Sequence, residues 1–218
     1  MVACPYYGTQ LCRPSTRLQI NINIAVNIVV SGGVENIKVS NCRFLGTDVG
    51  LRFKSCRGRG GVVKNIHIED IVMMDIPTEP LLFDLHYGGK SAVEAAEDGM
   101  SAYDVAYVPA DETTPQFRDI YIKDIVCSGA DRAMYFNGIP EKNIENIVVE
   151  DCEIVSEKGA DLRYSNGVIL KNVKITQAEG AGYSVANCHN VVIDDCSDAS
   201  GKEAPEVFVH NSHNLRVE

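Results

Sequence analysis

The segment Asn65-Ile-His-Ile-Glu-Asp-Ile71 alternates apolar and polar residues between two turn-prone residues. Such alternation is typical of a half-buried β-strand, and Asn and Asp favour turns. The same pattern begins again, more or less completely, at residues 36, 119, 146, 167, 190 and 214. Most copies are separated by 21 to 29 residues, and one gap of 54 residues fits one repeat plus an insertion. A unit this short cannot bury its own apolar face, so neighbouring units must stack.

The connections between the repeats decide how they stack. Hairpin turns at the spacing of an antiparallel meander are absent, and no amphipathic segment is long enough for a crossover helix. We therefore expect an all-β protein, a right-handed parallel β-helix. One interior column should contain equivalent apolar residues of successive repeats: Ile37, Ile66, Ile120, Ile147, Val168, Val191 and Leu215. A second column should contain Cys42, Ile71, Ile125, Cys152, Val173 and Cys196.

The eight cysteines contain no CxxC pair, which argues against a zinc ribbon or a thioredoxin-type site. Their positions in the repeat favour a packing role for Cys42, Cys152 and Cys196. The recurrent asparagines should form a hydrogen-bonded ladder at one turn of the solenoid; they are Asn36, Asn65, Asn146, Asn190 and Asn214. We expect neither a metal nor a cofactor.

The chain divides into an atypical N-terminal segment or partial coil, residues 1–33, and a series of coils, residues 34–218, interrupted by an inserted loop at about 84–116. Residues 21–30 are uncharged and β-prone, so an exposed N-terminal coil could support self-association. Because nothing at the N-terminal end reads as a polar cap and the sequence stops in the middle of a repeat at Glu218, we expect an interior portion of a longer solenoid. Within the loop, residues 91–96 could form one or two helical turns.

Composition limits the partners. The formal net charge of −10 makes nonspecific binding to nucleic acid or to an anionic membrane unfavourable. No apolar run has the length of a membrane span, and we recognise no signal peptide in the first residues, so the cellular location stays open.

Against this acidic background, residues 46–61, GTDVGLRFKSCRGRGG, contain four cations within eight residues: Arg52, Lys54, Arg57 and Arg59. On a strand, Arg52 and Lys54 would project from one face while Leu51 and Phe53 point to the other. A local cationic patch indicates one anionic ligand group. Salt bridges to Asp48 or Glu69 alone would explain the cations equally well.

The patch together with the following VVKNIHIEDIVMMDIP resembles the Arg-x-Lys segment of glycoside hydrolase family 28, the polygalacturonase family, in its bacterial branch. The resemblance continues through LLFDLHYGGK and the later coils, over roughly residues 30–218. It implies a parallel β-helix, inverting hydrolysis of α-1,4 galacturonosyl linkages in pectin, and a parent protein that is typically secreted or periplasmic. It also implies that Arg52 and Lys54 bind the substrate carboxylate, and that Tyr87 contacts the substrate.

The family's catalytic acids belong to an Asn-Thr-Asp segment and an Asp-Asp pair, followed by Gly-His-Gly, all before Arg-x-Lys. None of these motifs precedes it here; Asp194-Asp195 is an Asp pair but lies in a late coil, where a structural role is expected. We therefore assign no catalytic residue and expect a fragment without activity of its own.

Two other functions stay open. The first is a non-catalytic carbohydrate-binding or structural β-helix that uses only the cationic patch. The second is a pectate lyase, which would require clustered aspartates for calcium near the arginine, and we find no such cluster. The endo or exo action, the exact pectic substrate, the oligomeric state and the natural or truncated origin of the chain are not determined by the sequence. In the inserted loop, Tyr87, Lys90, Tyr103 and Tyr107 are possible ligand contacts, although we expect Tyr103 and Tyr107 to cover the flank of the solenoid.

Overall fold

The computed structural model describes residues 26–29, 33–86 and 104–218. These residues form eleven strands and no helix. The strands are β1 (Val26–Val29), β2 (Val34–Leu45), β3 (Leu51–Lys54), β4 (Val62–Ile76), β5 (Leu81–Asp84), β6 (Gln116–Asn137), β7 (Ile144–Arg163), β8 (Ser165–Ala186), β9 (His189–Asp194), β10 (Val207–His210) and β11 (His213–Val217).

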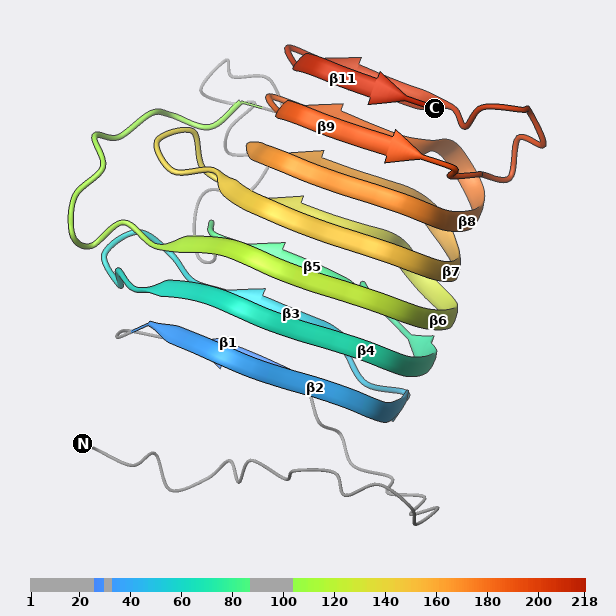
Figure 1. The fold of residues 1–218 in the computed structure, drawn as a ribbon, viewed down its shortest axis with the longest axis horizontal. Helices are drawn as coiled ribbons and strands as arrows, with labels where there is room; N and C mark the ends of the chain where they lie inside the picture. Colours follow the sequence, from blue (N-terminus) through green and yellow to red (C-terminus); the bar gives the residue numbers. More distant parts are fainter. Residues whose placement is uncertain (1–25, 30–32, 87–103) are drawn as a thin grey trace.

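Successive coils stack as parallel strands, as Figure 1 shows, and every pairing between named strands is parallel. The strands form two walls. Wall A consists of β1, β3, β5, the ends of β6, β7 and β8, and β10. Wall B consists of β2, β4, the first parts of β6, β7 and β8, then β9 and β11. The chain is thus a parallel β-helix, as its repeats predict.

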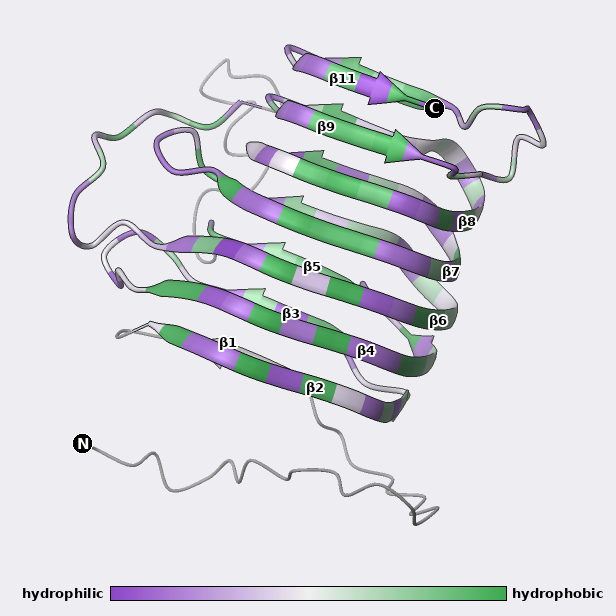
Figure 2. Cartoon of the chain, viewed as in Figure 1, coloured by the Kyte–Doolittle hydropathy of each residue, from purple (hydrophilic) through white to green (hydrophobic). Residues whose placement is uncertain are grey.

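Both predicted interior columns are confirmed. Ile37 pairs in register with Ile66, and the column continues through Ile120, Ile147, Val168 and Val191 to Leu215. The second column runs from Cys42 through Ile71, Ile125 and Cys152 to Val173, whose backbone N–H donates to Cys196 Sγ at 3.4 Å. Figure 2 shows the resulting alternation of apolar and polar bands along the strands.

The Asn and Asp positions of the repeat have a specific backbone role. Both adopt positive φ in each coil, as at Asn65 (54°) and Asp70 (55°) or Asn146 (52°) and Asp151 (53°). Asn and Asp tolerate this left-handed conformation better than other non-glycine residues. The repeat therefore encodes bends at fixed positions within otherwise continuous strands.

The predicted asparagine ladder is confirmed in part: it occurs as separate hydrogen-bonded segments, with two changes of member. Asn65 donates to Asn36 and Asn214 donates to Asn190, at 3.3 and 2.6 Å. Asn146 donates instead to Asp119, and Asn190 to Asn166. The second change arises because Gly167 takes the left-handed position of its coil, with φ of 73°, so the preceding Asn166 supplies the amide oxygen.

Candidate functional site

Arg52 and Lys54 lie on the outer surface of wall A. Their neighbours on β3, Leu51 and Phe53, are fully buried in the core, and Phe53 stacks on Phe83 with ring centroids 4.4 Å apart. Because side chains alternate along a strand, this packing fixes both cations on the opposite face. The local prediction for these four side chains is confirmed.

Among the described residues, Arg52 forms no close ion pair, although its charge acts on the Glu79 carboxyl. Its Nη1 lies 3.9 Å from an oxygen of the mostly exposed Asp48, a geometry that contributes little. Its Nε is buried and has no hydrogen-bond partner among the described residues. The other suggested partner, Glu69, pairs with Lys38 on wall B at 2.7 Å. Salt bridges to Asp48 or Glu69 therefore do not explain why a cation occupies position 52.

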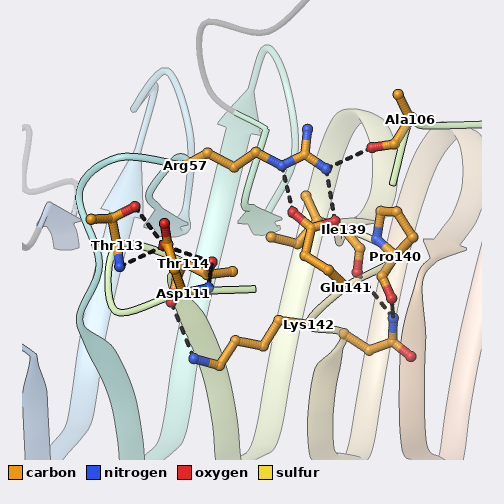
Figure 3. A network of polar contacts seen from close by, with 10 residues as sticks. Arg57, Ala106, Asp111, Thr113, Thr114, Ile139, Pro140, Glu141 and Lys142 are labelled. Carbon is orange, nitrogen blue, oxygen red and sulfur yellow. Dashed lines mark hydrogen bonds and ion pairs between the residues drawn. The ribbon is translucent and has the colours of Figure 1, made fainter. Parts of the chain in front are cut away.

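Arg57 has a different role (Figure 3). Its Nε and Nη2 donate to the two carboxylate oxygens of Glu141 at 2.5 and 2.8 Å, and Nη2 also donates to the carbonyl of Ala106. The Glu141 side chain is only 1% exposed. Arg57 therefore joins three separate parts of the chain and is occupied structurally, whereas Arg59 is exposed.

The described part of the inserted loop, residues 104–115, runs along one side of the stacked coils before entering β6 (Figure 1). Val105 N–H donates to the Tyr164 hydroxyl, and Thr113 carbonyl accepts from Gly58 and Gly60 N–H. Lys142 Nζ donates to the carbonyl of Thr114 (Figure 3). The loop is thus attached to several coils.

The expectation for Tyr107 is wrong. Its side chain is 68% exposed, since the loop is held by Arg57 and by backbone contacts rather than by packing of this ring. Tyr87, Lys90, Tyr103 and the proposed helical turns at 91–96 lie outside the described residues.

Wall A brings further polar residues beside the cations. In register with Lys54 lie Asp84, Asn137 and Arg163 on successive coils. In register with Arg52 lie Leu82, Tyr135 and Asp161. We did not single out these residues from the sequence, because wall A has short strands and a weak repeat. The aligned aromatic residues of LRFK, LLFD and MYFN, which are Phe53, Phe83 and Phe136, were the available signal.

Two titratable groups near these residues have shifted pKa values. Burial raises the pKa of Glu79, against the opposing influence of Arg132 and Arg52. Burial also lowers the pKa of His86, and the positive charge of Arg57 adds to that shift. Both groups therefore favour their neutral forms more than exposed carboxyl and imidazole groups do.

No cluster of three or more His, Cys, Asp or Glu side chains suited to a metal occurs in the described parts of the chain. A search of the same residues finds no helix that is both long and apolar enough to cross a membrane.

The fold and this site define a solenoid whose outer wall carries two adjacent cations, Arg52 and Lys54. Comparison with known families then identifies the chain: residues 29–158 match the model of glycosyl hydrolases family 28, and the chain belongs to that family.

Its relatives include a polygalacturonase of Gossypium barbadense, 46% identical over 55 residues, which are 25% of this chain and 13% of the relative. Polygalacturonase QRT2 of Arabidopsis thaliana is 28% identical over 168 residues, 77% of this chain and 30% of the relative. Endopolygalacturonase B of Aspergillus niger is 27% identical over 74 residues, 34% of this chain and 20% of the relative. The chain thus spans less than a third of the length of each. No solved structure matches it significantly.

Proposed function

We propose that this chain supplies the uronate-binding part of a pectin-degrading glycoside hydrolase, with Arg52 and Lys54 as the groups that bind a galacturonate carboxylate. The observation that carries the proposal is the placement of both cations, side by side, on the outer surface of wall A. Guanidinium and ammonium groups form strong, charge-assisted hydrogen bonds with carboxylates. Membership of family 28 and the polygalacturonase relatives support pectin as the substrate.

Inverting hydrolysis, which the family resemblance implies, needs one carboxyl group as general acid and another as general base. Wall A carries Asp84 and Asp161, but both are engaged. Asp84 accepts hydrogen bonds from His86 N–H and Asn137, and Asp161 binds Arg163 through both of its oxygens. We therefore assign neither as a catalytic group, and we propose that the isolated chain binds galacturonate without hydrolysing it.

Calorimetric titration with trigalacturonate tests the binding site. The double variant Arg52→Ala, Lys54→Ala should bind at least about tenfold more weakly than the unchanged chain, since hydrogen bonds to charged groups each contribute about 1.5–3 kcal/mol. The matched control is Lys174→Ala, Arg216→Ala, which removes two exposed cations from the later coils, away from wall A. Equal binding by both double variants would show that Arg52 and Lys54 form no specific binding site, and that the chain is only a structural scaffold.

Release of reducing ends from polygalacturonate tests the second part. We expect none from the purified chain. Robust turnover that the Arg52→Ala, Lys54→Ala variant abolishes would show that the carboxyl groups for catalysis are present after all.

A further inference from the structure

The charge that wall A presents changes sign between the β3 coil and the β5 coil. The β3 coil presents Arg52 and Lys54, and the adjacent β5 coil presents Asp84 directly beside Lys54 in the strand register. Neighbouring strands are about 4.8 Å apart, close to the length of one pyranose unit in a 1,4-linked chain. A polysaccharide that lies across the coils therefore meets the cationic pair with one sugar and Asp84 with the next.

Asp84 is held firmly in its outward position. Leu81 and Phe83, its neighbours on β5, are fully buried, so the alternation of the strand directs Asp84 to the outer surface. Its Oδ1 accepts hydrogen bonds from His86 N–H and from Asn137 Nδ2, each at 2.9 Å. Two donors converging on one oxygen fix the carboxylate in place.

The coils beyond Asp84 add no net positive charge to this row. Asn137 is neutral, and Arg163 forms a bidentate ion pair with Asp161 of the same strand, with Nη2 to Oδ2 at 2.6 Å. The Arg163 guanidinium lies over the Tyr135 ring, 5.4 Å from its centroid. On the flank of the wall, the charge of Arg132 faces Glu79 at 3.5 Å. The two cations of β3 are thus followed by an acidic coil and then by internally balanced coils.

We propose that Asp84 is a specificity-determining residue, which makes the position next to the Arg52 and Lys54 site accept an uncharged sugar unit in preference to a second free carboxylate. This inference rests on the proposed function, because it requires a uronate at the cationic pair. A carboxylate over the β5 coil would be repelled by Asp84, whereas a unit whose carboxyl group is esterified or absent can accept or donate hydrogen bonds there without that repulsion. The ligand class is a galacturonate linked to an uncharged unit.

Three hexagalacturonide preparations test this: one with all carboxylates free, one with about half of them methyl-esterified, and one with the same fraction reduced to hydroxymethyl groups. The unchanged chain should bind the two modified preparations more tightly than the free acid. Asp84→Asn should tighten binding of the free acid by about tenfold, since like charges a few ångströms apart near a protein surface repel on that scale. Binding of the modified preparations should change less than about twofold.

Two control variants separate local from general effects. Asp84→Asn keeps the oxygen that accepts both hydrogen bonds, so the fold should persist, and Asp84→Glu, which keeps the charge, should retain the preference. Asp124→Asn removes one exposed negative charge at a bend between wall residues, and asparagine tolerates the φ of 54° found there. If only the methyl-esterified preparation binds more tightly than the free acid, the position accepts a methyl group. If both modified preparations bind equally more tightly, the position rejects charge only. Either outcome supports the proposal.

The proposal is overturned if Asp84→Asn leaves the ratio of affinities unchanged, or if Asp124→Asn changes it equally. If either of these results occurs while the Arg52→Ala, Lys54→Ala variant loses binding, the role of Asp84 is refuted and the uronate site stands. When this double variant binds all three preparations as the unchanged chain does, or when no preparation binds, the proposed uronate site fails and the role of Asp84 fails with it.

Discussion

Arg57 and Glu141 form a bidentate ion pair across 84 residues of sequence, with the Glu141 side chain almost completely buried. The pair links the segment after β3 to the connection between β6 and β7. Through the carbonyl of Ala106 it also holds the inserted loop (Figure 3). The cationic stretch 46–61 therefore contains two kinds of cation, with Arg52 and Lys54 on the outer wall and Arg57 joined to a buried acid.

Replacement of Arg57 should destabilise the fold. Arg57→Gln leaves the buried Glu141 carboxylate without its cation, and breaking such a pair costs about 3 kcal/mol or more. Urea unfolding followed by circular dichroism measures the loss. The double variant Arg57→Gln, Glu141→Gln should recover a large part of it, because no buried charge then remains. A single variant as stable as the unchanged chain would show that the pair contributes nothing.

The same pair predicts a dependence on pH. Burial pushes the pKa of Glu141 upward, but the hydrogen bonds and charge of Arg57, with backbone N–H donors, outweigh it and lower the pKa below 4.5. A carboxyl group with a lowered pKa stabilises the fold above its unfolded pKa, and this contribution is lost as the pH falls through the folded value.

The difference in unfolding free energy between the unchanged chain and Arg57→Gln should therefore be largest at neutral pH. It should shrink below about pH 4.5, where protonation of Glu141 removes the unpaired charge of the variant. Denaturation midpoints measured from pH 3 to pH 7 check this. A difference that stays constant over that range would contradict the assignment of the stabilisation to an ionised Glu141.

Position in the repeat decides how much of the structure could be predicted. Ile66 and its column follow from a period that the sequence displays openly, and so do the bends at Asn65 and Asp70. The partner of Arg57 could not be found in this way, because Glu141 lies in a connection between coils that has no repeat. The adjacency of Lys54 and Asp84 depends on pairing two four-residue strands, β3 and β5, and alternation over four residues is too short to fix a register.

The cysteines test the packing of the core. Burial raises the pKa of the Cys127 and Cys152 thiols to about 12 and that of Cys188 to about 11. The thiolate is the reactive form, so these three side chains should resist alkylation by iodoacetamide at pH 8 in the folded chain. Cys56, which is half-buried, should react.

Peptide mass spectrometry after timed labelling distinguishes the sites. In guanidinium chloride, all eight cysteines of the sequence should be modified at similar rates, which provides the control. Labelling of Cys152 as fast as that of Cys56 in the folded chain would refute its place in the interior column.

The left-handed bends can be tested at Asn190, where two roles coincide. Its φ is 54°, and its side chain donates to Asn166 at 2.8 Å and accepts from Asn214 at 2.6 Å.

Asn190→Gly removes both hydrogen bonds but tolerates the backbone conformation, as Gly167 does one coil earlier with φ of 73°. Asn190→Ala removes the same bonds and adds the strain of a left-handed conformation, about 1–2 kcal/mol, part of which is offset because glycine loses more entropy on folding. Urea unfolding should therefore show that the Asn190→Ala variant is less stable than the Asn190→Gly variant by about 0.5–1 kcal/mol, with equal m-values. If the two variants are equally stable, or the alanine variant is the more stable, the asparagine is retained for its hydrogen bonds and the backbone bend is not under strain.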